Sequence, residues 1–229
     1  MEKFDFNTME EFDKHISSSI PAFKELQEFI VSLSTFFVKD ASTVLDLGCS
    51  TGSLLVKLWK KNNMASYYGY DIAPNIIQQL DQLPVGVELI LQDITELNPK
   101  GEIGFAASKI LPTYDLALLI FVLQFLPPSS RLPLLSNLRA AMVSGGGLIV
   151  AEKVYQDSGF LESVINSAHY DFKRKYFSPE EIWNKQETLR SIMMPFSDAD
   201  NIAMFKAAGF SATPIWQSLN FKAWLLLKD

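Results

Sequence analysis

The stretch Val44–Ser53, which reads VLDLGCSTGS, decides the fold. Its first four residues are mostly apolar, which predicts a short buried strand, and Asp46 interrupts that run. Gly48 and Gly52 then enclose a tight loop, and the LLVKLWK that follows carries apolar residues at helical spacing. The stretch therefore predicts a strand, a glycine loop and a helix whose first N–H groups face any ligand over the loop.

The loop spacing is G-x-x-x-G, which differs from two common nucleotide sites. Dinucleotide sites use G-x-G-x-x-G, and phosphate-binding P-loops end in Gly-Lys-Ser/Thr. A strand acid followed by GCSTG resembles the first motif of the class I S-adenosylmethionine (SAM) methyltransferases. The resemblance implies that Asp46, Gly48, Cys49, Ser50 and Gly52 bind the cofactor, in particular its methionine end. A purely structural turn in an α/β protein is the alternative.

A second acid follows the next predicted strand, Tyr67–Tyr70. Asp71 lies nineteen residues after Gly52, at the point where that strand ends. Because neighbouring parallel strands end side by side, its carboxylate can accept hydrogen bonds from both ribose hydroxyls. Ile72 beside it is a further cofactor candidate. The alternative is an N-cap for a helix over Ala73–Leu80, and the two roles are compatible.

A third acid follows the predicted strand Val87–Leu91. The residues after it are Gln92, Asp93 and Ile94. In SAM enzymes an acid here accepts from the adenine amino group and the next apolar residue packs on the ring, so the resemblance assigns these roles to Asp93 and Ile94. Three strand ends that each carry an acid, in this order, predict a SAM site.

Composition sets the outer limits. The chain has 229 residues, 48% of them apolar, and a formal charge of −6, so it gains no long-range attraction to nucleic acid or anionic membranes. Cys49 is the single cysteine, which is typical of a reducing cytoplasm. The N-terminus lacks the apolar core of a secretory signal, and the longest apolar run, Leu116–Leu126, is too short for a bilayer. We therefore expect a cytoplasmic protein without membrane contact or a bound metal.

Alternating strands and helices predict the fold class α/β. We expect a Rossmann-like, seven-stranded, mostly parallel sheet with an antiparallel C-terminal hairpin. In the second half the expected elements are a long central strand from Tyr114 towards Leu126, a helix over Ser129–Val143 ended by Gly145–Gly147, a strand over Leu148–Lys153, a helix over Ala199–Ala208 closed by Gly209, and final strands over Ala212–Trp216 and Phe221–Leu227.

The whole chain, 1–229, is expected to form one domain with two helical additions. An N-terminal cap covers 1–40, where Pro21 divides two helices and Phe23 is a candidate cofactor contact. A lid covers 155–193, where two helices break near Phe177-Ser178-Pro179. Ser178 with the proline and two acids that follow is a strong helix start.

Several longer stretches suggest a closer family. DLGCSTGS, FVLQFLPPSSR, AEKV, AHYDFKR, FKAAGF and NFKAWLLLK together resemble the carboxy-SAM synthases, from Ile20-Pro21 to the last strand. These bacterial enzymes use prephenate to turn SAM into carboxy-SAM for wobble-uridine modification of tRNA. The resemblance, with surplus aromatic residues in the lid helices, implies a homodimer, and it makes tRNA a partner by way of the pathway.

Three positions depart from that family. It has a tyrosine where this chain has Phe23, an asparagine where this chain has Ile120, and a carboxylate-binding arginine where this chain has Gln186. A buried carboxylate without a cationic partner costs several kcal/mol, so the altered site favours SAM over carboxy-SAM. Arg190, one helical turn after Gln186, is the candidate replacement.

Substrate contacts are expected from Gln124, Glu152, His169, Tyr170 and Arg174. His169 is a candidate general base because its ordinary pKa is near neutral, and Gln124 and Arg174 complete the candidate catalytic set. A packing role for His169 is the alternative. The basic run 173–175 can hold an anionic substrate or an RNA phosphate, or it is a solvated helix face.

Three functions follow from these observations and stay open. The first is methyl transfer from SAM to an unidentified small-molecule or RNA acceptor, with S-adenosylhomocysteine (SAH) as product. Such a displacement depends mostly on alignment, so the lack of a catalytic triad does not argue against it. The second is carboxy-SAM synthesis with Arg190 in the missing role. The third is a non-catalytic SAM-binding subunit.

Overall fold

A mixed sheet forms the centre of the computed structural model, which describes residues 12–74, 83–99 and 110–228. Its strand order is β3-β2-β1-β4-β5-β8-β7. The first five are parallel and β8 runs antiparallel to both neighbours, which confirms the predicted sheet and hairpin. A short β6, Phe196–Ser197, pairs with the end of β5. The strands are β1 Thr43–Leu47, β2 Ser66–Asp71, β3 Val87–Leu91, β4 Tyr114–Ile120, β5 Met142–Tyr155, β7 Phe210–Ser218 and β8 Phe221–Lys228.

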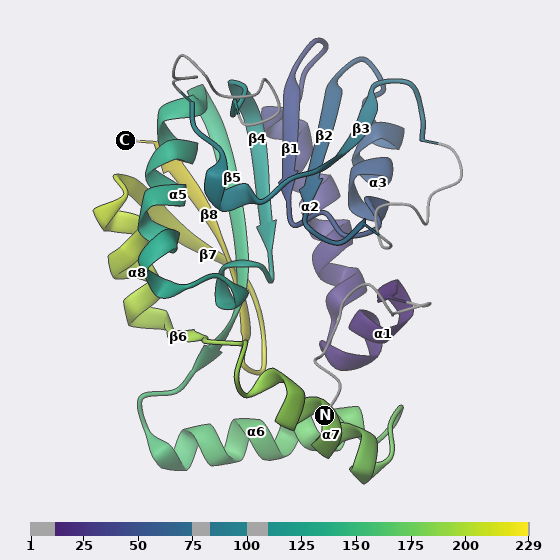
Figure 1. Cartoon of the computed structure of the whole chain (residues 1–229), viewed down its shortest axis with the longest axis vertical. Helices are drawn as coiled ribbons and strands as arrows, with labels where there is room; N and C mark the ends of the chain where they lie inside the picture. The colour runs from purple at the N-terminus through teal and green to yellow at the C-terminus, as the bar shows by residue number, and fades with distance from the viewer. Residues whose placement is uncertain (1–11, 75–82, 100–109, 229) are drawn as a thin grey trace.

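Helices cover both faces of this sheet (Figure 1). On one face lie α2, Phe23–Phe37, and α3, Ser53–Lys61, which bury leucine and isoleucine side chains against β1, β4 and β5. On the other lie α5, Pro128–Ala141, and α8, Asp198–Ala207. Burial on both faces explains why the central strands are almost continuously apolar.

Three further helices lie beyond the carboxyl end of the sheet (Figure 1). They are α1, Phe12–Ser19, α6, Gly159–Lys173, and α7, Pro179–Leu189. The predicted division at Pro21 and the break before Pro179 are confirmed. Ser178 and Glu181 form a capping box, which satisfies two N–H groups at the start of α7. We refer to residues 155–193, which contain α6 and α7, as the insertion.

The expectation that Gly145–Gly147 ends a helix is wrong. Helix α5 stops at Ala141, and the glycines lie inside β5. Gly147 pairs with strands on both sides, and a Cβ there would stand 2.8 Å from the ring of Phe37 on α2. The glycine therefore allows a helix to pack closely on a continuing strand.

The long apolar run after Tyr114 is also not one strand. β4 ends at Ile120, and Phe121 takes a left-handed φ of 61°. A 3-10 turn, η4 (Leu123–Phe125), follows. The apolar pattern continues because Leu123 stays buried in the turn, so hydrophobicity alone does not reveal where the strand stops.

Two expected segments lie mainly outside the described residues. These are the helix over Ala73–Leu80 and the first eleven residues of the N-terminal cap, 1–40. Over the described ranges, no helix combines the length and the apolar character needed to cross a membrane.

Candidate functional site

The glycine loop is held against the end of β2. The N–H groups of Gly48 and Cys49 both donate to the carbonyl of Tyr70, at 2.7 and 3.0 Å. Gly48 has φ 86°, and a Cβ on it would stand 2.4 Å from the side chain of Val122. Gly52, with φ 73°, is the N-cap of α3. Positive φ and close packing both explain the glycines at the two ends of the loop.

Ser50 connects the loop to Asp71. Its N–H donates to Asp71 Oδ2 at 2.9 Å, and the N–H of Ala73 donates to Oδ1 at 3.0 Å. Each carboxylate oxygen keeps a further lone pair, so these bonds leave room for ligand hydroxyls. The hydroxyl of Ser50 is buried and finds no hydrogen-bond partner among the described residues. An unpartnered polar atom in a glycine loop fits a ligand that accepts or donates there.

Asp46, in β1, and Cys49, within the glycine loop, are both buried. Burial, and then the charge of Asp71, raise the pKa of Asp46 to about 7. Burial is also the main reason that the pKa of Cys49 lies well above its ordinary value, with Asp46 and Asp71 adding to it. A thiol that stays protonated is a poor nucleophile, which agrees with a packing role for Cys49.

At the end of β3, Asp93 begins a short turn, η2 (Ile94–Glu96). Its Oδ1 accepts from the N–H of Thr95 at 2.8 Å and from the Thr95 hydroxyl at 2.7 Å. Ile94 packs into the core, whereas Ile72 is 68% exposed. Among the described residues at this edge, Ile72 and Leu91, the last residue of β3, are therefore apolar side chains open to a ligand.

Aromatic rings close the end of β4. Phe23, at the start of α2, lies 6.1 Å from the ring of Phe121, which lies 5.6 Å from the ring of Phe221 at the start of β8. Ile120, the last residue of β4, is half-buried in the same cluster. Sequence reasoning missed Phe121 and Phe221. The alternation of Phe221 with Ala223 in the last strand is the signal that both side chains lie on one face of the sheet, the face that packs against α2 and α3.

Two of the expected substrate contacts, Glu152 and Gln124, accept hydrogen bonds from the backbone. Glu152 accepts from the N–H groups of Val122, Leu123 and Gln124, at 3.2, 2.8 and 2.9 Å. Burial raises its pKa to about 8, although these bonds favour the ionised form. Gln124 is buried, and its Oε1 accepts from the N–H of Lys153 at 2.9 Å. Both side chains therefore shape the turn after β4.

Arg131 is a buried charge that the sequence did not single out. Its Nη2 donates to the carbonyls of Leu126 and Met194, at 3.0 and 2.7 Å, and its guanidinium lies over the ring of Phe196. Met194 in turn donates its N–H to the carbonyl of Gln124. Arg131 thus anchors the chain where it returns from the insertion.

His169 joins two helices. Its Nε2 donates to the carbonyl of Ser19 in α1 at 2.8 Å, and its ring packs edge-on against Phe221. Burial, and then the charge of Lys173, lower its pKa to about 4, with a smaller contribution from Lys153. A neutral, buried ring whose Nε2 proton is already donated favours the packing role over the general base.

Replacing His169 by Gln should make folding less sensitive to acid. Because the folded-state pKa lies below the ordinary value, its contribution to stability is complete above about pH 6.5 and is lost as pH falls towards 4. Between pH 7.5 and pH 5, the free energy of unfolding should fall by up to about 2 kcal/mol more in the wild type than in His169→Gln. Glutamine still donates to Ser19, and all other titrating groups are common to both proteins. Equal losses in thermal melts would contradict this assignment.

The remaining candidates lie on the outer surface of the insertion. Arg174 is exposed and stands over the ring of Tyr170, one helical turn earlier. Gln186 is exposed on α7, and Arg190 pairs with Glu187 on the same helix, with 65% of its side chain exposed. The structure does not bring these four side chains together with the glycine loop.

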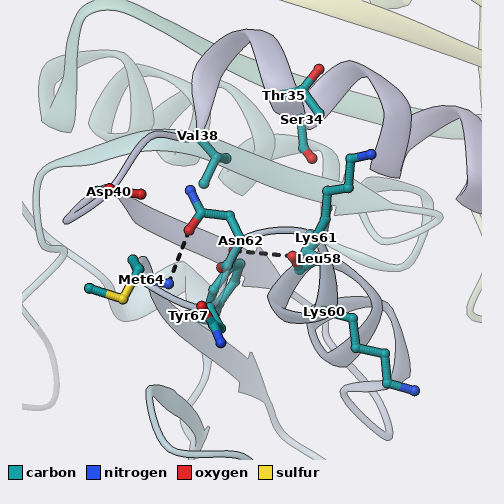
Figure 2. A pocket seen from close by; sticks show the side chains of 11 residues that line it. Ser34, Thr35, Val38, Asp40, Leu58, Lys60, Lys61, Asn62, Met64 and Tyr67 are labelled. Atoms are coloured by element: carbon teal, nitrogen blue, oxygen red, sulfur yellow. Dashed lines mark hydrogen bonds between the residues drawn. The ribbon is translucent and has the colours of Figure 1, made fainter.

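A separate cavity of about 470 Å³ lies at the opposite end of the sheet (Figure 2). It is formed where α2 and α3 end, between Val38, Asn62, Met64 and Tyr67. Asn62 accepts from the N–H of Met64 and donates its own N–H to Leu58. Because the loop and its acids lie at the carboxyl end, this cavity is not part of their site.

Comparison with known proteins agrees with this geometry. A family described as a methyltransferase domain matches residues 45–148, which contain the glycine loop and all three strand acids. The chain is 28% identical to the carboxy-SAM synthase of Campylobacter hominis, over 99% of this chain and 94% of that protein. It is 29% identical to carboxy-SAM synthase 1 of Yersinia pseudotuberculosis, over 98% of this chain and 94% of that protein.

Solved structures share the fold. A chain of the Haloferax volcanii complex between the Trm112 methyltransferase activator and a methyltransferase superposes with a TM-score of 0.67, at 14% identity and 99% coverage of both chains. The SAH-bound methyltransferase CalO1 of calicheamicin biosynthesis gives 0.60, at 15% identity over 90% of this chain. The present chain covers 54% of the length of CalO1.

Strand order, glycine loop and strand-end acids thus define the class I methyltransferase fold, with the chemistry of the loop suited to SAM. The match to a methyltransferase domain over residues 45–148 supports a SAM-dependent enzyme with this fold, and the chain is similar to the carboxy-SAM synthases over nearly its whole length.

Proposed function

We propose that this protein transfers the methyl group of SAM to an acceptor and releases SAH. The observation that carries the proposal is the bond from Ser50 to Asp71, which fixes the loop beside a strand-end acid while the Ser50 hydroxyl is left without a described partner. That arrangement offers donors and acceptors to the methionine and ribose parts of one ligand.

The proposed binding roles follow the strand ends. Asp71 accepts the ribose hydroxyls, Asp93 accepts the adenine amino group, and the ring lies beside Ile72, with Ile94 supporting it from the core. The methionine end is assigned to the loop and its strand acid: Asp46, Gly48, Cys49, Ser50 and Gly52. When bound, SAM supplies a sulfonium methyl that is already activated for displacement.

The chain contributes mainly alignment and the exclusion of water. Phe23, Ile120 and Phe121 form an apolar wall at the end of β4, next to the proposed cofactor position. Holding an acceptor in line with the methyl group accounts for up to about 7–11 kcal/mol of a barrier in ideal cases. We propose that the cap, 1–40, and the insertion, 155–193, which would act as a lid, complete this enclosure within a single domain, 1–229.

Carboxy-SAM synthesis is the second candidate function, because the two synthases above match this chain from end to end. Two observations favour methyl transfer. Gln186 carries no charge and is exposed, and Arg190, the candidate replacement, already pairs with Glu187. A carboxylate in the pocket would therefore lack a fixed bidentate partner.

Competition between SAM and carboxy-SAM tests this choice. We expect the wild type to prefer SAM or SAH and to form no carboxy-SAM when prephenate is added. Arg190→Ala should leave the preference unchanged, with Lys175→Ala as the control for loss of an exposed charge. If the wild type prefers carboxy-SAM and Arg190→Ala abolishes that preference, the methyltransferase proposal is wrong.

A homodimer is a further part of the proposal. Apolar and aromatic side chains are exposed along the insertion, including Phe160, Tyr176 and Trp183. Burying them against a second copy would stabilise an assembly. Light scattering at micromolar concentration should report twice the monomer mass of 25.8 kDa. A monomer at all concentrations would contradict the dimer without affecting SAM binding.

The acceptor is proposed to be a small molecule, with RNA as the alternative. The net charge of −6 disfavours long-range attraction to RNA, although the tRNA pathway of the similar synthases keeps tRNA as a candidate partner. A cytoplasmic location stays a prediction, based on the single cysteine. Measuring SAH release across a metabolite panel, with tRNA as one sample, separates the two kinds of acceptor.

A further inference from the structure

Three lysines from different elements beyond the end of β4 are linked by electrostatic repulsion, from Lys153 to Lys173 and from Lys173 to Lys185. They are Lys153 of β5, Lys173 of α6 and Lys185 of α7, here called the lysine cluster. All three are half-buried, whereas Arg174 and Lys175, which follow Lys173, are exposed. The basic run 173–175 is therefore not one solvated face, because its first member turns inward.

Contacts between the elements bring the first two lysines to the same place. Lys153 lies directly opposite Phe221 in the β5–β8 ladder, so both side chains point to the same face of the sheet. The ring of Phe221 contacts the ring of His169, with centroids 5.1 Å apart. Lys173 lies four residues after His169, on the same side of α6.

The charges in this cluster oppose one another. Burial, and then the charge of Lys153, lower the pKa of Lys173 to about 8. Burial, and then the charge of Lys173, lower the pKa of Lys185 to about 8. Burial also lowers the pKa of Lys153, against the opposing effect of Glu162. On α1, burial and the charges of Lys185 and Lys173 lower the pKa of His15 to about 4.

Positive groups withdrawn from water repel each other, and a bound anion relieves both the repulsion and the loss of hydration. The place is also suitable for a substrate, since Phe221 contacts Phe121 directly after β4. Ligands of open α/β sheets bind at this carboxyl edge.

We propose that the lysine cluster binds an anionic group, a carboxylate or a phosphate, of the molecule that accepts the methyl group. This rests on the proposed function, because it places the acceptor at the end of β4. Ammonium groups from β5, α6 and α7 surround the anion and join the insertion to the sheet when it is bound. The insertion therefore selects the acceptor by charge.

Inorganic phosphate and malonate are the probes, each compared with sodium chloride at equal ionic strength and neutral pH. The wild type should show a saturable rise in melting temperature with at least one of them. A response to phosphate alone identifies a phosphoryl group, and a response to malonate alone identifies a carboxylate. Lys173→Met should weaken that response at least about tenfold, because it removes one charge-assisted contact.

Lys173→Met should also melt at a higher temperature than the wild type in chloride alone, because the repulsion is reduced. Lys175→Met, which removes an exposed lysine two residues away, is the matched control and should behave as the wild type. If Lys173→Met does not fold, Lys153→Met carries the same test, because Lys153 is the charge that repels Lys173.

Equal melting of the wild type in phosphate, malonate and chloride would overturn the inference, as would an unchanged response in the folded cluster variant. Titration of the wild type with SAM separates the two proposals. SAM binding without anion binding contradicts only the lysine cluster. Absence of SAM binding by the wild type contradicts the proposed function.

Discussion

The affinity for SAM should fall at least about 100-fold when Asp71 is replaced by Ala. The variant loses two hydrogen bonds from the ribose to a charged acceptor, each contributing about 1.5–3 kcal/mol. It also loses the two bonds from Ser50 and Ala73 that position the loop, so pre-organisation is lost together with direct contact. Isothermal titration calorimetry measures both the affinity and the enthalpy that these bonds contribute.

Asp115→Ala is the matched control for this experiment. Asp115 also accepts a backbone N–H, from Thr43 at 2.8 Å, but at the opposite end of β1. The Asp115→Ala variant should be less stable than the wild type but should keep its affinity for SAM. Unchanged SAM affinity in Asp71→Ala would remove Asp71 from the site.

The largest effect on stability is expected for Glu152→Ala. The replacement leaves the N–H groups of Val122, Leu123 and Gln124 buried without their acceptor. Each unsatisfied group costs about 1–3 kcal/mol, so the loss of all three bonds should destabilise the variant by about 3–9 kcal/mol. Typical domains are stable by only about 5–15 kcal/mol, so this loss is a large part of the total. Urea denaturation measures it as a fall in the transition midpoint.

Glu152→Gln serves as the control that keeps the shape of the side chain. Its amide oxygen can still accept from Val122 and Leu123, while its NH₂ group faces the donor of Gln124. The loss should therefore be clearly smaller than for Ala. Equal stability of the Ala variant and the wild type would show that the turn after β4 does not depend on this carboxylate.

Local signals in the sequence predicted much of the fold. The strand over Val87–Leu91 and the helix start at Ser178 are found where expected, because period, capping and proline act over a few residues. The glycine loop is found for the same reason, since Gly48 and Gly52 both need positive φ.

The rest depends on contacts between distant segments. Gly147 continues β5 by pairing with strands on both sides, and its lack of a side chain makes room for Phe37, which is far away in sequence. Glu152 and Gln124 are polar residues near the expected site, and only the path of the backbone shows that their side chains accept from backbone N–H groups. Lys173 and Lys175 look alike in sequence, and the packing of α6 on its neighbours decides which one turns inward.

The short ladder between β5 and β6 closes the insertion at its base. Val154 pairs with Phe196 and Tyr155 with Ser197, so the chain leaves the sheet and returns to it at the same point. The entropy of closing a loop grows only slowly with its length, so this base tolerates segments of different sizes. The insertion can therefore vary in length and sequence without disturbing the pairing of the strands that carry the glycine loop.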